Sequence, residues 1–425
     1  MRAPPAARPS AALAPPAPVN PDERLRLLDA LRGFALLGIF LINVGDFALF
    51  PLMPVEDRAE LPLGSLTQLA ATVSLVLVRA KFYTIFSFLF GLGFAMLLAR
   101  AASRGADFPR LYGRRLAVLL AIGAVHMTLI WHGDILAVYA LLGFLLPRFA
   151  RVSDRGLLIW AAALFAAPAA VRAVIVLSGG ALDPGSPLRA ASQWLDRRLL
   201  GTTEDAALLA VLQSGDWLLL LKYNLAGPLY RLSELCSSLR LPRVLGAFLL
   251  GVYAGRRRIL EDAAAHRDRL RRVLIWCLPV GLAANAVLAA MSSPGRPPGA
   301  PVRIAEDLVS AGVVPLALAY IAGFALLWLR PSARRGLAWF APAGRMALTN
   351  YLAQSVIGIF VFYGVGLGLG GRVGSAAAAL IAIVVFAVQV LLSALWLRRY
   401  RYGPVEWMWR SLAYGRRQPL QRGAG

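Results

Sequence analysis

Charged residues are scarce in this chain of 425 residues. They make up only 16% of it, while 59% of the residues are hydrophobic, whereas an ordinary soluble domain carries about 25% charged and about 45–50% apolar residues. This composition excludes a soluble globular domain. It also excludes a disordered chain, because disorder combines high net charge with low hydrophobicity. A membrane protein with many apolar helices is what remains.

Cysteine and lysine are nearly absent. Cys236 and Cys277 are single and have no CxxC spacing or nearby histidines, so they predict neither a metal site nor a disulfide framework. We expect two small buried side chains instead. Lysine occurs twice against 43 arginines, and the net charge is +23. A preference for arginine and alanine throughout the sequence accounts for part of this charge, which therefore does not indicate a nucleic-acid partner.

The two ends of the chain differ in composition from its middle. Residues 1–23 hold seven prolines and much alanine, which is typical of a disordered, solvated tail. No uninterrupted apolar stretch in them suits a signal peptide. We expect a cytoplasmic tail over 1–23, a single transmembrane helical domain over 24–413, and a cytoplasmic C-terminal tail over 414–425.

Apolar runs recur as far as residue 397. A hydrocarbon core of about 30 Å requires about 20 apolar residues per helix, and the sequence predicts an all-α polytopic membrane protein with about ten such spans. Two of these, 134–147 and 244–255, are short. The predicted spans are 33–50, 82–99, 115–131, 134–147, 157–177, 244–255, 273–291, 307–329, 346–365 and 375–397.

Two further apolar stretches, 62–79 and 217–239, decide the orientation of everything that follows them. If neither crosses the membrane, the inner segments hold 31 basic residues in 118 and the outer segments 13 in 126. Basic residues favour the cytoplasmic side, so we interpret both stretches as interfacial or re-entrant segments on the outer side. Both termini are then cytoplasmic, and the basic inner surface faces anionic lipids.

An ionisable side chain inside a span costs at least about 2.5–3.5 kcal/mol, so each one calls for a reason. His126 lies near the end of one span and Asp134 follows Gly133, where a bend can fold the carboxylate back onto the imidazole. Such a pair is the minimal general base for removing a proton from a hydroxyl or an amine. The alternative is a helix-packing hydrogen bond. His132 is a local alternative to His126.

Five more polar or charged residues lie in or beside the first and second spans. Asp29 and Arg32 are i,i+3 neighbours, which predicts a local ion pair, and Asn43 and Asp46 have the same spacing. For this second pair, a helix-to-helix hydrogen bond is the structural reading. Lys81 either reaches the outer interface with its ammonium group or binds an anion at the mouth of a pocket.

Polar residues recur near the C-terminus. Asn350 and Gln354 form a stripe on an apolar span, and such a stripe faces protein or a polar cavity. Beyond the last span, Glu406 and Arg410 have ion-pair spacing. Two tryptophans, at 407 and 409, are typical of interfacial anchors.

Several of these residues belong to motifs that occur in one order. The motifs are Leu28-Asp29-Ala30-Leu31-Arg32-Gly33, Lys81-Phe82-Tyr83, Gly133-Asp134-Ile135-Leu136, Gly344-Arg345-Met346 with Thr349-Asn350-Tyr351, and Gly403-Pro404-Val405-Glu406-Trp407. From about residue 24 to 420 the chain resembles the YeiB-like family of bacterial inner-membrane proteins, a domain of unknown function (number 418). That family is grouped with membrane proteins similar to the acyltransferase-3 and heparan-glucosaminide acetyltransferase families.

The resemblance implies a ten-helix protein of the bacterial cytoplasmic membrane that transfers an acyl group from a cytoplasmic thioester, with a histidine as base. Acyl-CoA is then a co-substrate, and we expect no permanently bound cofactor or metal. A proton-coupled transporter and a non-catalytic membrane protein are the alternatives, and a homo-oligomer stays open. The expected catalytic residues are His126, Asp134 and His132. The expected substrate or donor contacts are Asp29, Arg32, Asn43, Asp46, Lys81, Tyr83, Arg345, Asn350, Gln354 and Glu406.

Overall fold

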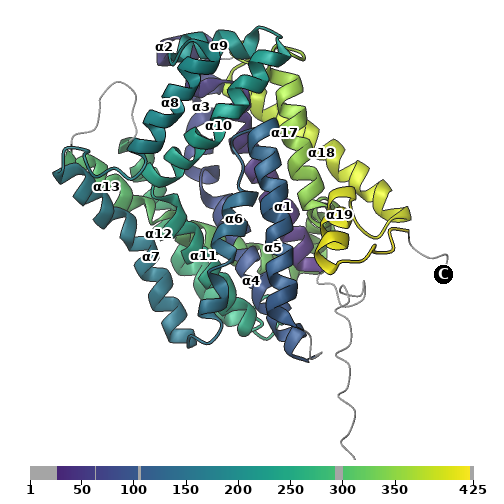
Figure 1. Ribbon diagram of the computed structural model, residues 1–425. Helices are drawn as coiled ribbons and strands as arrows, with labels where there is room; N and C mark the ends of the chain where they lie inside the picture. Colours follow the sequence, from purple (N-terminus) through teal and green to yellow (C-terminus); the bar gives the residue numbers. More distant parts are fainter. Residues whose placement is uncertain (1–25, 63, 104–106, 292–299, 422–425) are drawn as a thin grey trace, which may run out of the picture.

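A computed structural model describes residues 26–62, 64–103, 107–291 and 300–421 (Figure 1). The N-terminal tail predicted over 1–23 lies outside these ranges. Every regular element in them is a helix, which confirms the all-α prediction. The helices are α1 Arg26–Phe47, α2 Val55–Glu60, α3 Gly64–Val73, α4 Lys81–Ser103, α5 Phe108–Val125, α6 Leu136–Gly143, α7 Asp154–Leu177, α8 Ser186–Leu200, α9 Asp205–Gln213, α10 Trp217–Ser237, α11 Arg240–Arg256, α12 Arg267–Met291, α13 Ala300–Ser310, α14 Val313–Trp328, α15 Pro331–Leu337, α16 Ala341–Arg345, α17 Ala347–Phe362, α18 Ser375–Arg399 and α19 Pro404–Tyr414. Short 3₁₀ or π turns are η2 Phe50–Leu52, η3 Ser74–Val78, η4 His126–Ile130, η5 Leu146–Phe149 and η6 Ala338–Phe340.

Seven helical stretches among the described residues are long and apolar enough to cross a membrane, and an eighth is obtained when α10 and α11 count as one bent span. The two remaining predicted spans, near 134–147 and 346–365, are shorter. Helix α6 has 8 residues and α17 has 16, and at about 1.5 Å per residue α6 covers less than half of a bilayer core. The seven stretches are Arg26–Leu52, Ser65–Ser103, Phe108–Ile130, Asp154–Leu177, Arg267–Met291, Val302–Trp328 and Ser375–Arg399.

One of these stretches, Ser65–Ser103, has a break within it, and so does the bent pair of α10 and α11; the sequence predicted neither break. Residues 65–78 do not form a separate interfacial segment but continue into α4, with a break at Ala80, whose φ is 69°. Helices α10 and α11 meet at an angle of 72° beside Leu239, whose φ is 52°. A positive φ is uncommon outside glycine, and each break leaves the N-terminus of a new helix inside the protein.

Helix α1 is the centre of the bundle, because its N-terminal half and its C-terminal half belong to two different hydrophobic cores. Its N-terminal end touches α16 without any side chain between them. A Cβ added at Gly344 would lie 1.8 Å from the carbonyl oxygen of Asp29, and one added at Gly33 would lie 2.1 Å from that of Phe340. Helices α4 and α11 approach each other in the same way, through Gly91 on α4 and Gly251 on α11.

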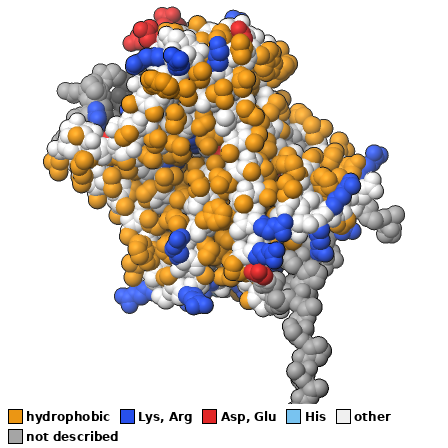
Figure 2. Space-filling model, in the orientation of Figure 1, with side chains coloured by type: hydrophobic (Ala, Val, Ile, Leu, Met, Phe, Trp, Pro, Cys, Tyr) orange, Lys and Arg blue, Asp and Glu red, His pale blue; other side chains and the backbone are white. Residues whose placement is uncertain are grey.

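The surface agrees with a membrane environment. Figure 2 shows apolar side chains over the middle of the face in view, with Lys and Arg gathered toward its two ends. Acidic side chains are visible at the end that carries α2 and α9. Helices α5 and α19 pack together at the other end, where α1 begins, and we call this the N-terminal end of the bundle.

Replacing Gly344 by alanine is expected to push α16 away from α1, because the new Cβ would overlap a backbone oxygen that cannot rotate away. Overpacking of this kind costs typically about 1–3 kcal/mol. The measurement is thermal unfolding of the detergent-purified protein. Gly113→Ala in α5 is the matched control, since its Cβ would meet nothing within 4 Å. Equal melting temperatures for the two variants would contradict the contact.

Candidate functional site

His126 and Asp134 meet in the interior. Helix α5 ends at Val125, and His126 opens the π turn η4, in which the Trp131 amide donates to the His126 carbonyl at 2.8 Å. Beyond this turn the chain bends back, and α6 begins at Leu136. Nδ1 of His126 lies 2.8 Å from Oδ2 of Asp134, so the predicted return of the carboxylate onto the imidazole is confirmed. A π turn within a helix is frequent at functional sites.

The Asp134 carboxylate is fixed from a second side. Its Oδ1 accepts a hydrogen bond of 2.7 Å from the Ala137 amide at the start of α6, and the positive end of a helix dipole favours negative charge. The backbone oxygen of Asp134 accepts from Nε and Nη2 of Arg231 on α10, each at 3.3 Å. Three helices therefore hold this residue in place.

A third residue completes the arrangement, and sequence reasoning gave it no role. Oγ of Ser355, on α17, lies 2.9 Å from Nε2 of His126. Because the Asp134 carboxylate can only accept from Nδ1, we assign the proton to Nδ1, which leaves Nε2 to accept the Ser355 hydroxyl proton. The three side chains are at most 1% exposed. No local motif signals this contact, because 229 residues separate His126 from Ser355.

Two cavities lie near His126, Asp134 and Ser355. The first opens at the N-terminal end of the bundle, and we call it the α19 cavity. It has a volume of about 270 Å³, and its lining is apolar apart from a few groups. Helices α1, α4, α5, α17 and α19 contribute to it. The charged side chains that line it are Arg32, Arg115, Arg345, Arg410 and Glu406.

The second cavity, of about 770 Å³, lies toward the end that carries α9, and we call it the α10 cavity. It is polar and is lined by charged side chains of both signs. A smaller space of about 80 Å³, the connecting pocket, extends it inward and shares Asn43, Tyr83, Arg231 and Arg240 with it. The charged lining residues of the α10 cavity are Asp46, Arg58, Arg79, Asp196, Asp205, Arg231, Glu234 and Arg240.

The α19 cavity and the connecting pocket meet at one wall. Ile39, Ile135 and Tyr351 line both the α19 cavity and the connecting pocket. The Tyr351 ring centre lies 5.4 Å from that of His126, and its hydroxyl donates to the Gly133 carbonyl at 3.5 Å. His126 itself is covered, so the wall beside it separates two spaces that enter from opposite ends of the protein.

The residues expected from the sequence are divided between these places. Asp29 and Arg32 form the predicted ion pair, at 2.9 Å, at the N-terminal end. Asn43 and Asp46 line the α10 cavity, and neither has a side-chain hydrogen bond or ion pair among the residues that the structure describes. His132 also lines this cavity, and among the described residues it has no hydrogen bond to Asp134; its buried Nδ1 has no hydrogen-bond partner there.

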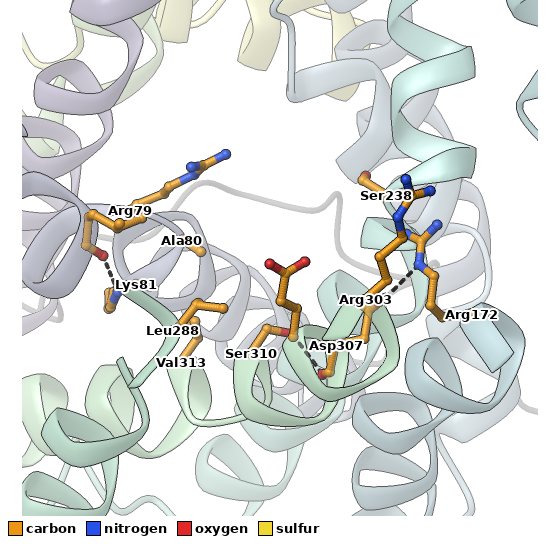
Figure 3. Close-up of a pocket in the computed structure, with 12 residues that line it drawn as sticks. Arg79, Ala80, Lys81, Arg172, Ser238, Leu288, Arg303, Asp307, Ser310 and Val313 are labelled. Atoms are coloured by element: carbon orange, nitrogen blue, oxygen red, sulfur yellow. Dashed lines mark hydrogen bonds and ion pairs between the residues drawn. The ribbon is translucent and has the colours of Figure 1, made fainter. Parts of the chain in front are cut away.

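Lys81 is not at an interface. It is 1% exposed, and its ammonium donates to the Leu75 carbonyl at 2.9 Å, across the break between η3 and α4. It lines a further cavity of about 480 Å³, the α13 cavity, into which Arg79 extends (Figure 3). On the opposite wall Arg172 donates to Asp307 at 2.8 Å, which explains an arginine within the apolar helix α7.

The polar stripe on α17 faces helix α18 and lines none of these cavities. Nδ2 of Asn350 donates to Oγ of Ser393 at 2.9 Å, and Nε2 of Gln354 donates to Oε1 of Gln389 at 3.0 Å. Gln389 in turn donates to the Asn350 carbonyl at 3.0 Å. The stripe faces protein, as expected, and in the structure it joins two helices; the contact with a substrate stays a prediction.

Glu406 binds the start of α17, a contact that the sequence did not predict; its predicted ion pair with Arg410 stays a prediction. Its Oε1 accepts from the amides of Leu348 and Thr349 at 2.7 and 3.1 Å, and its Oε2 accepts from the Thr349 hydroxyl at 2.5 Å. These amides are among those that a helix N-terminus leaves without partners. Burial is the main cause that raises the pKa of the Glu406 carboxyl above its usual range.

The tryptophans of α19 also bind within the protein. Nε1 of Trp409 donates to the Arg115 carbonyl at 2.9 Å, and the Arg115 guanidinium lies 4.3 Å from the centre of the same ring. Nε1 of Trp407 donates to the Gln418 carbonyl at 2.8 Å. Their first role is therefore to dock α19 against α5 and the C-terminal residues.

The fold and surface together define an all-helical membrane protein. Residues 254–416 match the sequence profile of the family described as "Protein of unknown function (DUF418)". The chain is 34% identical over 412 residues to the uncharacterized protein YxaH of Bacillus subtilis (strain 168), covering 95% of this chain and 98% of the relative. It is 30% identical over 413 residues to the uncharacterized protein YeiB of Escherichia coli (strain K12), covering 92% and 96%. The chain belongs to this family of YeiB-like proteins.

Glu406 supplies a prediction about stability and pH. Glu406→Ala removes the acceptor of two amides at the start of α17 and should cost about 0.5–2 kcal/mol, as loss of a helix cap does. Glu406→Gln keeps an acceptor oxygen without the charge. Because the pKa of Glu406 is raised in the folded state, the folded protein holds this proton more tightly than the unfolded chain.

The stability of the wild type should therefore fall, relative to Glu406→Gln, as the pH rises from 4.5, the ordinary pKa of glutamate, through the raised pKa. Melting temperatures of the three proteins measured across this range in detergent test the claim. Parallel curves for wild type and Glu406→Gln would show that the carboxyl is not held in a desolvating environment.

Proposed function

We propose that this protein is a membrane acyltransferase that takes a thioester donor into the α19 cavity and an acceptor into the α10 cavity. The observation that carries the proposal is the shared wall of Ile39, Ile135 and Tyr351, which separates the two spaces directly beside His126. Transfer of a group across a membrane protein requires a reactive centre that is reached from both ends.

The chemistry of the α19 cavity suits an acyl-CoA donor. Its four arginines supply planar, permanently charged donors that match phosphate oxygens. The inner part is lined by leucine and phenylalanine side chains, which suit an acyl chain or the thin pantetheine arm. Arg32 and Arg345 were among the substrate or donor contacts expected from the sequence, and both line this cavity together with Arg115 and Arg410.

The α10 cavity suits an acceptor with several hydroxyl or amino groups. Its walls combine carboxylates and guanidinium groups with the aromatic side chains of Tyr223, Tyr230 and Tyr363. Carboxylates accept hydrogen bonds from hydroxyl groups and arginines donate to them, so a polar ligand is matched at many positions. Asp46 faces this cavity with no side-chain hydrogen bond among the described residues, so its carboxylate is available to such a ligand.

His126 is the proposed base. Asp134 holds the imidazole so that Nε2 is the proton acceptor, and it stabilises the imidazolium that forms. In this closed arrangement the Tyr351 ring covers the imidazole, so the reaction requires that ring to turn aside when both substrates are bound. A closed centre excludes water, which would otherwise hydrolyse the acyl group.

The charge distribution gives the proposal a direction. The N-terminal end of the bundle carries the more basic segments, so we place the α19 cavity and both termini on the cytoplasmic side of the bacterial inner membrane. Anionic lipids would then face this end. A donor from the cytoplasm and an acceptor from the outside are consistent with this orientation.

A transporter is the second candidate, and the two broken helical stretches favour it. The N-terminal ends of α4 and α11 lie at breaks inside the protein, and Ala80 and Arg240 beside these breaks line the connecting pocket. Transporters commonly place such interrupted helices at their binding sites. Uptake of a solute by proteoliposomes in the absence of any acyl donor is the result that would select this function.

The test of the proposed function is acyl transfer by purified protein. Protein is incubated with labelled acetyl-CoA and an extract of bacterial membranes as the source of acceptor, and labelled products are separated from the donor. His126→Ala and Asp134→Asn are expected to lower the rate by about 10²–10⁴-fold, because general-base catalysis supplies a factor of that size. Both variants should still bind acetyl-CoA.

His266→Ala is the matched control, because this histidine lies in the connection between α11 and α12 and its Nε2 bonds to the Arg257 carbonyl, away from both cavities. It should retain full activity. Absence of label in any product of the wild type, or unchanged transfer by His126→Ala, would contradict the proposal.

A further inference from the structure

We propose that Ser355 is a nucleophile that carries the acyl group as an ester during transfer, an inference that rests on the proposed function. Its hydroxyl lies 2.9 Å from Nε2 of His126, whose Nδ1 lies 2.8 Å from Asp134. A nucleophile bonded to a base that is itself oriented by a third group is the arrangement that activates serine. The substrate class is a thioester.

Two other buried serines, Ser87 and Ser393, lack this arrangement. Ser87 on α4 bonds to the Tyr139 hydroxyl and the Tyr83 carbonyl, and Ser393 on α18 accepts from the Asn350 amide. All are neutral partners that cannot remove a proton at neutral pH. A serine that serves only helix packing has no need of a base, whereas Ser355 is bonded to the imidazole that Asp134 orients.

The position of Ser355 also fits. It lies one helical turn beyond Tyr351 on α17, and Tyr351 forms the wall between the α19 cavity and the connecting pocket. Residues four apart on a helix lie on the same face. If the Tyr351 ring moves aside, a thioester in the α19 cavity can therefore approach the Ser355 hydroxyl. An acceptor can approach the same oxygen from the connecting pocket on the other side of the wall.

The reaction divides into two balanced steps. In the first, Oγ of Ser355 attacks the thioester carbonyl while its proton passes to Nε2 of His126; the carbon–sulfur bond breaks, and the thiolate leaves with that proton as free thiol. In the second, an acceptor hydroxyl gives its proton to Nε2 and attacks the serine ester; the ester bond breaks, and the proton returns to Oγ. No oxidant, reductant or metal takes part.

Burial supports an ester intermediate. Ser355 is 1% exposed and His126 and Asp134 are no more exposed, so water does not reach the position that the ester would occupy. A hydrolase must admit water to its acyl-enzyme, whereas a transferase must exclude it until the acceptor arrives. A covalent intermediate also lets donor and acceptor bind at different times, as two cavities at opposite ends allow.

The test is isotope exchange between acetyl-CoA and labelled free CoA, measured without any acceptor on the purified full-length protein. Exchange requires an acyl-enzyme, since a direct transfer cannot return the group to CoA. The wild type should exchange label and yield an acetylated peptide that contains Ser355. Ser355→Ala should lose exchange by at least about 10²-fold and carry no acetyl group.

Ser393→Ala is the matched control, because it removes a buried hydroxyl from the neighbouring helix while leaving His126 untouched. It should exchange at the wild-type rate. Ser355→Cys, which keeps a nucleophile, should trap the group as a thioester, so that a failure of Ser355→Ala to fold would not hide the result.

Other outcomes would overturn the inference. If the wild type transfers acetyl groups to membrane acceptors but shows no exchange and no acetyl-serine, the acyl group passes directly and Ser355 only orients His126; the proposed function then survives. Acetylation at another residue would also overturn it. If the wild type shows neither exchange nor transfer, the proposed function itself has failed.

Discussion

The buried carboxylate of Asp134 is the group on which the centre of this protein depends. A carboxylate removed from water is tolerated only when its oxygens are paired. Here one oxygen is bonded to His126 and the other to the Ala137 amide at the N-terminus of α6. Arg231 holds the carbonyl of the same residue. These contacts tie α5, α6 and α10 together, and Ser355 adds α17 through the other imidazole nitrogen. The site and the packing of the helices are thus one structure.

Much of the fold follows from the sequence, because apolar length is a direct physical signal. Seven of the ten predicted spans correspond to helices long enough to cross a membrane. The approach of Asp134 to His126 was also predictable, since only eight residues and a glycine bend separate them. The order of the motifs pointed to the family to which the chain belongs, and Glu406 shows why: one motif caps the helix that another begins.

What the sequence did not disclose depends on contacts between distant segments. Ser355 and His126 are 229 residues apart, and no local pattern marks their hydrogen bond. Hydropathy cannot tell a separate interfacial segment from the first half of a broken helix, so the break at Ala80 and the burial of Lys81 were missed. Spacing showed that Asn350 and Gln354 share a face, but only the structure shows that α18 covers it.

The proposed transfer depends on the wall formed by Ile39, Ile135 and Tyr351, with the His126 network directly behind it. The most direct test is an experimental structure of the purified protein with a non-hydrolysable acyl-CoA analogue. We predict phosphates at the arginines of the α19 cavity, the sulfur end of the analogue at Tyr351, and the tyrosine ring turned away from His126. An analogue bound elsewhere, or an empty α19 cavity at saturating analogue, would contradict this prediction.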